Sequence, residues 1–469
     1  MFEQKITDDK IVEWLEHDDI NRNNDLLSML KILDNSEGNV LYSLNGNWGS
    51  GKTIFLRKLV MLVNRCHFLK HNYATDKSIF KLSDDKRTKL DEMIKSKYSI
   101  FNEMIDKSDI DCVYFNAWEH DDEEDPILSI LYDLINNYKL INAIDVANSS
   151  KLTTAICTII KNIEYKKIKN IDLKGLIKEF NFDEELVRKE RIKEAVTEIL
   201  NELISENCNK LIIFVDELDR CNPNYVVKML ERLKHYFNDE RIIMVVSTNL
   251  VELSNLISSF YGNNESAIQY LDKIIDFKLE LPVKKVDNYL LTIPIFSDER
   301  NIEDLLYVMK RIIETNNFEY RMINRYAALM SFFVRNIRVN NANSGYKKHI
   351  FFMNNVMIPY AVGLSIQNYN SYINFSNGKG WNEFRNFLES DNVIESLAKK
   401  FFEGDITDKE TMNNFDCYKE LEIIYKNLFS NKKKDIKTQL GNYHYNDLIN
   451  EKEKLSILGS LSDFGSLKD

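Results

Sequence analysis

Residues 46–53 read Gly46-Asn47-Trp48-Gly49-Ser50-Gly51-Lys52-Thr53, which has the spacing G-x-x-x-x-G-K-T of a phosphate-binding loop. A short apolar run at residues 39–44 precedes this stretch and predicts a β-strand, and residues 54–63 follow it with the character of a helix. In such a strand–turn–helix unit the backbone N–H groups of the turn point at a polyphosphate. The stretch therefore predicts an α/β fold that binds a nucleotide at this turn.

The positions of this loop have separate expected roles. All eight residues are expected to line the nucleotide site, because three glycines let the backbone turn tightly and approach the phosphates without a Cβ clash. We expect Lys52 to reach the β- and γ-phosphates and the Thr53 hydroxyl to ligate Mg²⁺. Short motifs also match by chance, so a glycine turn before a surface helix is the alternative interpretation.

A second segment ends in two acidic residues. Residues 211–217 read Leu-Ile-Ile-Phe-Val-Asp-Glu and predict a buried parallel strand, at whose carboxyl end ligands of open α/β sheets bind. Asp216 is expected to hold the Mg²⁺ shell through water, and Glu217 to polarise the water that attacks the γ-phosphate. The pair favours hydrolysis over transfer to a second substrate. A core strand followed by a solvated acidic turn is the alternative.

Two further polar residues are catalytic candidates. Asn249 follows a predicted strand at residues 242–247 and could orient the lytic water, or it could equally cap the next helix. Arg220 could stabilise transition-state charge, within the chain or across a subunit interface. Its alternative role is an ion pair with Asp219 that fixes the loop after the strand.

The sequence resembles the KAP family of P-loop NTPases, a branch of the STAND-like ATPases, in four separated blocks. These blocks are residues 46–53, Val113-Tyr114-Phe115-Asn116-Ala117-Trp118-Glu119, Asp216-Glu217-Leu218-Asp219-Arg220-Cys221-Asn222-Pro223, and Tyr270-Leu271-Asp272-Lys273-Ile274-Ile275 followed by Leu281-Pro282. Many bacterial members carry transmembrane helices within the NTPase domain, and this sequence shows none. The resemblance implies ATP as ligand, and bacterial roles that include defence against phage with a separately encoded effector protein.

Together these features predict a P-loop NTPase core with a parallel sheet, helical insertions and a helical C-terminal domain. The expected order is an N-terminal helical segment at 1–38, the core at 39–283 with insertions at 68–108 and 127–208, a helical lid at 284–345, and a C-terminal helical domain at 346–469. The nucleotide would bind between the core sheet and the lid. Aromatic residues of the last domain, including Tyr360, Tyr369 and Trp381, are expected in its core.

Composition limits the partners. The 469 residues carry a net charge of −11, so the whole molecule is not expected to hold nucleic acid electrostatically, although lysine groups at 166–169 and 432–434 leave local binding open. The six cysteines are scattered, which suits reduced thiols in the cytoplasm. The longest membrane-like stretch, residues 152–160, is far shorter than the roughly 20 apolar residues of a spanning helix. We therefore expect a cytoplasmic protein with no membrane partner.

Three hypotheses for function follow. The first is an Mg²⁺-dependent ATPase that acts as a switch, and we expect it to form a homo-oligomer in which Arg220 could act across the subunit interface. The second is a nucleotide-stabilised scaffold with little turnover, and the third is an ATPase stimulated by nucleic acid. Trp48 and Trp118 are expected to pack in the core rather than on the nucleotide base. His120 is expected in an exposed loop, and no cysteine or histidine is assigned to a metal.

Overall fold

The computed structural model divides into two compact units, Lys5–Lys284 and Lys285–Asp469 with Met1–Gln4, which are described separately. The described residues are 7–18, 22–71, 80–123, 125–137, 155–156, 159, 186–262, 264–281, 290, 303–341, 352–400, 416–429, 436–437 and 442–443. Both lysine groups, Cys157, Pro282 and most of the stretch 152–160 lie outside them. None of the described helices is both long enough and apolar enough to cross a membrane.

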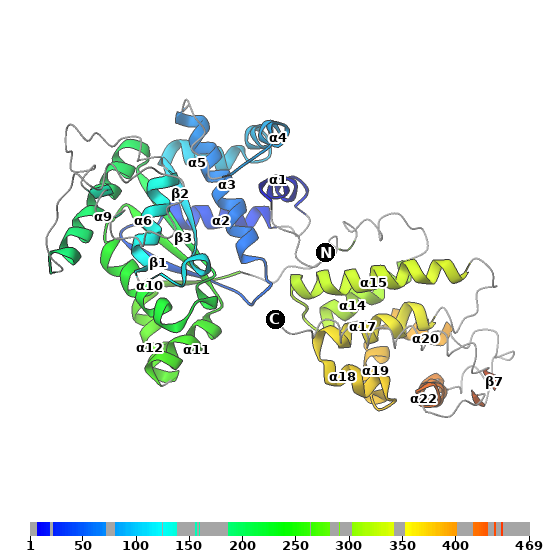
Figure 1. The fold of residues 1–469 in the computed structure, drawn as a ribbon. Helices are drawn as coiled ribbons and strands as arrows, with labels where there is room; N and C mark the ends of the chain where they lie inside the picture. Colours follow the sequence, from blue (N-terminus) through cyan, green and yellow to red (C-terminus); the bar gives the residue numbers. More distant parts are fainter. Residues whose placement is uncertain are drawn as a thin grey trace. The chain divides into compact units, whose positions relative to one another are not determined.

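The first unit is built on a five-stranded parallel sheet with strand order β2-β3-β4-β1-β5. Figure 1 shows helices packed around this sheet. The strands are β1 (Val40–Asn45), β2 (Ile110–Asn116), β3 (Lys210–Asp216), β4 (Ile242–Thr248) and β5 (Phe277–Glu280). The inner strands are apolar along nearly their whole length because helices cover both faces of the sheet. In this order β4 lies between β1, which leads into the glycine-rich loop, and β3, which ends in the acidic pair.

Each face of the sheet has its own hydrophobic core. The core on one face contains α1 (Asp8–His17), α2 (Asn23–Asp34), α3 (Lys52–His71), α4 (Asp84–Lys95) and α5 (Ser99–Ser108). The core on the other face contains α6 (Pro126–Asn137), α9 (Leu186–Asn207), α10 (Pro223–Tyr236), α11 (Leu250–Tyr261) and α12 (Asn264–Ile274). The predicted N-terminal segment thus contributes α1 and α2 to the face that α3 covers.

Local sequence determines where α10 begins, directly after the acidic loop. The Asn222 side chain accepts a hydrogen bond from Tyr225 N at 2.9 Å, and Pro223 takes the first helical position, where its missing N–H costs nothing. This cap fixes the length of the loop that carries Glu217 and Arg220. The short loop keeps both side chains at the carboxyl edge of the sheet.

The described residues of the second unit are almost all helical, apart from a small antiparallel ribbon. Its elements are α14 (Glu303–Thr315), α15 (Tyr320–Asn341), a π-helical turn (Met353–Met357), α17 (Ile358–Gln367), α18 (Tyr369–Ser376), α19 (Trp381–Glu389), α20 (Asn392–Lys400), α22 (Cys417–Leu428), β6 (Ile436–Lys437) and β7 (Asn442–Tyr443). One core joins residues on both sides of the expected boundary at 345. The assignment of 284–345 as a lid stays a prediction.

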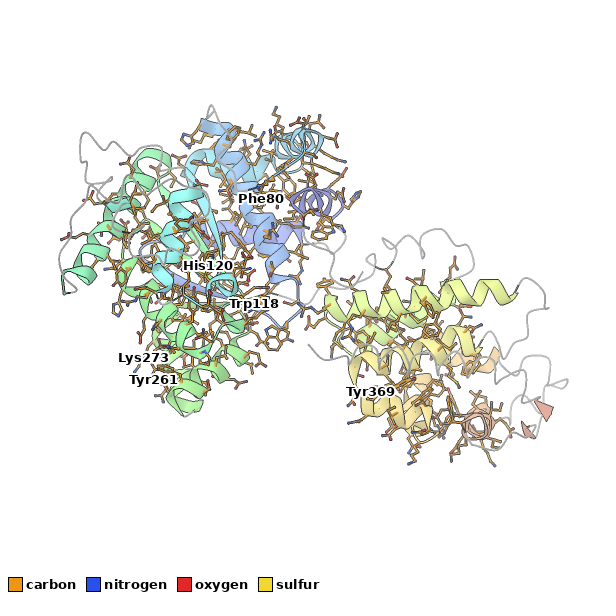
Figure 2. The ribbon with its side chains drawn as sticks, viewed as in Figure 1. Phe80, Trp118, His120, Tyr261, Lys273 and Tyr369 are labelled. Atoms are coloured by element: carbon orange, nitrogen blue, oxygen red, sulfur yellow. The ribbon has the colours of Figure 1, made fainter. Side chains whose placement is uncertain are left out.

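The aromatic residues of this unit form the centre of its core. Tyr360 packs on Phe384 with ring centroids 4.9 Å apart, and Trp381 packs on Tyr425 at 5.7 Å. Tyr369, labelled in Figure 2, is the exception to the expected core set because it is 45% exposed. The α/β fold with a parallel sheet and the helical C-terminal region are confirmed.

Candidate functional site

The glycine-rich loop connects β1 to α3 in a conformation that requires glycine. Gly49 and Gly51 have φ values of 88° and 91°, in the left-handed region that residues with a Cβ rarely adopt. A Cβ on Gly46 would lie 2.8 Å from Ser50 Oγ. The loop is therefore a tight turn, which is the backbone geometry that a phosphate-binding loop needs.

Lys52 lies at the first position of α3 and is buried. Its ammonium group donates hydrogen bonds to the carbonyl oxygens of Gly46 and Asn47, the latter at 3.1 Å. The buried Ser50 Oγ has no hydrogen-bond partner within the described part of the chain. No acidic residue lies in the first turn of α3, so the positive end of the helix dipole and Lys52 act together. The loop is therefore suited to an anion.

Arg22 supports the loop from outside and was missed by the sequence analysis. Its guanidinium is buried and donates a hydrogen bond to the carbonyl oxygen of Ser50 at 3.3 Å. Arg22 lies 28 residues before Ser50, in a polar segment without a motif, so no local pattern indicates this contact. It places a further positive charge beside the anion site.

Asp216 lies on the face of the sheet that α3 covers. Side chains alternate along a strand, and Ile212 and Phe214 belong to the core that contains α3, so Asp216 shares their face. Its buried carboxylate accepts hydrogen bonds from the Tyr114 hydroxyl at 3.0 Å and from Glu217 N at 2.9 Å. Burial and the neighbouring Asp216 raise the pKa of Tyr114 well above its ordinary value, which keeps this hydroxyl a donor.

Thr53 follows Lys52 in the first turn of α3 and is half-buried. A hydroxyl and a carboxylate oxygen are the hard ligands that Mg²⁺ prefers, and Mg²⁺ usually retains several waters. The chemistry of Thr53 and Asp216 therefore fits the ion, and their role as its ligands stays a prediction.

Glu217 has a left-handed backbone conformation, with φ 59° and ψ 26°. Its carboxylate forms an ion pair with Arg220 at 3.0 Å, and the Arg220 guanidinium lies 5.2 Å from the centre of the Trp118 ring. The partner of Arg220 is thus Glu217, whereas the sequence suggested Asp219. The candidate base, Glu217, and the candidate catalytic arginine, Arg220, are therefore paired with each other in this structure.

Asp219 connects three segments of the site. One oxygen of its buried carboxylate accepts hydrogen bonds from Trp48 Nε1 at 2.7 Å and from Asn249 N at 2.8 Å. Trp48 and Trp118 are 47% and 50% exposed, so the expectation that both pack in the core was wrong. Trp48 instead joins the glycine-rich loop to Asp219 in the loop after β3, and Asp219 in turn binds the backbone at the end of β4.

Asn249 caps α11, the alternative that its position allowed. Its Oδ1 accepts a hydrogen bond from Val251 N at 3.1 Å. The preceding residue pair, Ser247 and Thr248, is buried, and neither hydroxyl has a partner among the described residues. Ser247 shares the α3 face with Val245 by strand alternation. This alternation was visible in the sequence, and it makes Ser247 a candidate polar contact beside Asp216 that the sequence analysis missed.

We expected His120 in an exposed loop, and this was wrong: it ends the short 3₁₀ helix after β2, and its side chain is only 20% exposed. Figure 2 labels this residue. The ring stacks on Phe115 at 4.9 Å, its Nδ1 lies 3.1 Å from Glu123 Oε1, and its Nε2 lies 3.8 Å from Asp133 Oδ2. Burial raises the pKa of Asp133 to about 6, against the opposing effect of His120.

This shift predicts a pH dependence of stability. The folded chain binds a proton at Asp133 at a higher pH than the unfolded chain does, so the free energy of unfolding falls as pH rises from about 4 to about 6. Asp133→Asn removes this cost and should stabilise the protein by about 1–3 kcal/mol at pH 8, with a smaller gain at pH 5. Urea unfolding at both pH values, with the exposed Asp272→Asn as control, measures the difference. An equal gain at both pH values would contradict the assignment.

The loop at the end of β1, the buried acid at the end of β3 and the strand between them define the class of P-loop nucleotide-binding domains. The sequence profile of the KAP family P-loop domain matches residues 22–323, and the chain belongs to this family.

Two solved structures of the Aeropyrum pernix ORC2 protein are also similar to this chain. The form described as ADPNP–ADP complexes is 13% identical, covers 94% of this chain and 95% of its own, and has a TM-score of 0.33. The ADP form is 13% identical, covers 94% of both chains and has a TM-score of 0.31. These values are too low to carry an argument about function. A search of curated proteins found no match.

Proposed function

We propose that the chain is an Mg²⁺-dependent ATPase that acts as a molecular switch. The observation that carries this proposal is the buried carboxylate of Asp216, which Tyr114 holds on the face of the sheet that α3 covers. It belongs to a KAP domain in which the glycine-rich loop leads directly into α3. Thr53 and Asp216 would hold the Mg²⁺. When bound, the ion neutralises charge on the β- and γ-phosphates.

The present contacts of Lys52 support its role at the phosphates. The ammonium group donates hydrogen bonds to the carbonyl oxygens of Gly46 and Asn47, which both belong to the glycine-rich loop. Phosphate oxygens are stronger, charged acceptors, so Lys52 exchanges these contacts for the nucleotide without a large change in its own position. The loop is therefore already folded for its ligand, which reduces the ordering cost of binding.

We infer that hydrolysis is faster when the Glu217–Arg220 ion pair opens. The released Glu217 carboxylate is a stronger base for the attacking water, and the same event frees Arg220 to approach the γ-phosphate. Ser247 and Asn249 are the candidates for holding that water at the end of β4. We propose that contact with a second copy of the chain, in a homo-oligomer, opens this ion pair. The family resemblance suggests a role in phage defence, in which the switch would control a separate effector protein.

The same ion pair also favours a second candidate function, a nucleotide-stabilised scaffold with little turnover. Such a protein would bind ATP with the Glu217 carboxylate held permanently by Arg220. The two functions place Arg220 differently: in the switch it assists the transition state, and in the scaffold it only restrains the base.

Arg220→Ala distinguishes them. In the switch, phosphate release under saturating Mg–ATP should fall at least about tenfold, because transition-state charge loses its partner. In the scaffold, release should rise above that of the wild type, because Glu217 is set free. Arg241→Ala serves as the control, since this arginine pairs with Asp239 at 2.6 Å, at the amino end of β4. A rise in Arg220→Ala would overturn the switch, whereas a fall would remove the scaffold.

A further inference from the structure

The carboxyl-terminal end of α3 carries a cluster that the nucleotide site does not use. His67 and His71 are four residues apart and therefore share one face of the helix. Asp109, the residue directly before β2, faces them from the amino edge of the sheet. With a rise of about 1.5 Å per residue, His67 lies on the order of 20 Å along α3 from Lys52. The cluster is thus separate from the glycine-rich loop.

The three side chains converge on one point. His71 Nε2 lies 2.7 Å from Asp109 Oδ1, and His67 Nε2 lies 3.7 Å from the same oxygen. The ring centroids of the two histidines are 4.4 Å apart, and one ligand atom from each of the three residues lies within 4.8 Å of the others. These separations are close to those between the ligands of one tetrahedral metal ion, whose bonds are about 2 Å long.

We propose that His67, His71 and Asp109 bind a divalent transition-metal ion of the Zn²⁺ class. Two imidazole nitrogens and one carboxylate suit Zn²⁺ and its neighbours, and they do not suit Mg²⁺, which prefers oxygen ligands. The set leaves a position for water, and His71, at 28% exposed, gives the ion a path from solvent.

A second carboxylate supports this arrangement. His67 Nδ1 lies 3.7 Å from Asp111 Oδ2, on the side of the ring away from Asp109. Asp111 is itself buried and held by hydrogen bonds from Asn64 Nδ2 at 2.6 Å and from Cys112 N at 2.8 Å. Metal-binding histidines commonly direct their other ring nitrogen to a carboxylate, which orients the ring and raises its basicity.

The backbone at Asp109 points to the same function. This residue ends α5 with φ 52° and ψ 58°, a left-handed cap position that glycine or asparagine usually occupies. An aspartate here places its carboxylate beside both histidines, which glycine could not do. Lys70 donates to Asp109 Oδ1 at 2.8 Å and to the Asp106 carbonyl at 2.9 Å. The metal ion displaces Lys70 from Asp109, and Lys70 keeps its second acceptor.

A bound ion would join the carboxyl-terminal end of α3 to the start of β2. Binding to the folded chain alone then stabilises it by mass action, in proportion to the logarithm of free metal concentration. The site would fix α3 on the sheet independently of nucleotide.

Zinc binding to the chelator-treated full chain tests the proposal. Equilibrium dialysis without nucleotide should give one tightly bound Zn²⁺ per chain, and Lys52→Ala should bind it equally well. His71→Gln and Asp109→Asn should each weaken binding more than the 10- to 100-fold that is typical of losing a supporting carboxylate, the loss expected for Asp111→Asn. Asparagine tolerates the left-handed conformation, so Asp109→Asn should fold even if another variant does not.

The exposed His235→Gln is the matched control and should bind as the wild type does. Co²⁺ in place of Zn²⁺ should show an absorption spectrum of nitrogen and oxygen ligands, without the strong charge-transfer bands of a cysteine thiolate. The proposal is overturned if wild-type protein binds no Zn²⁺, if His71→Gln and Asp109→Asn bind it unchanged, or if Co²⁺ reports thiolate ligands.

Discussion

Glu217→Gln is expected to slow ATP hydrolysis by about 10²–10⁴-fold while leaving ATP binding nearly unchanged. Glutamine keeps the size of the side chain and loses the carboxylate that accepts the proton of water. The ion pair with Arg220 at 3.0 Å is lost as well, and this loss cannot restore hydrolysis because no base remains. Phosphate release and nucleotide affinity, measured on the same preparation, separate the two effects.

The control for this experiment is Glu240→Gln, which makes the same chemical change in an exposed turn before β4. It should hydrolyse ATP as the wild type does. If Glu217→Gln binds ATP and hydrolyses it at the wild-type rate, Glu217 is not the base, and another acceptor near the end of β3 must be sought.

Lys52→Ala has the second large expected effect, on nucleotide binding itself. Hydrogen bonds to charged groups contribute about 1.5–3 kcal/mol, so the affinity for Mg–ATP should fall by about 10- to 150-fold. Because ligand binding raises the unfolding temperature by mass action, the rise that ATP causes in the wild type should shrink or vanish in the variant.

The matched control is Lys107→Ala, which removes an exposed lysine in the last turn of α5. It should keep the full rise in unfolding temperature with ATP. A rise in Lys52→Ala equal to that of the control would show that the glycine-rich loop does not hold the phosphates.

The sequence predicted those parts of the site that depend on neighbours in the chain. The loop at 46–53 and the strand ending in Asp216 each carry their information within eight residues, because glycine spacing and an apolar run specify a tight turn and a buried strand. The parallel sheet followed from the same segments.

Contacts between distant segments could not be predicted in this way. Trp48 meets Asp219 across 171 positions, and Arg22 meets Ser50 across 28. The first contact depends on the order of strands in the sheet, and the second on how α2 packs beside the loop. Without that order, both tryptophans appeared to be core residues. The spacing of His67 and His71 was visible, but Asp109 lies 38 residues beyond His71, and only folding brings it to the cluster.

The most direct test of the central claim is the stoichiometry of ATP binding, measured by equilibrium dialysis with and without Mg²⁺. The account predicts about one ATP per wild-type chain with Mg²⁺, weaker binding after EDTA, and weaker binding in Asp216→Asn even with Mg²⁺ present. Wild-type protein that takes up no nucleoside triphosphate, or Asp216→Asn that binds Mg–ATP as tightly as the wild type, would contradict it.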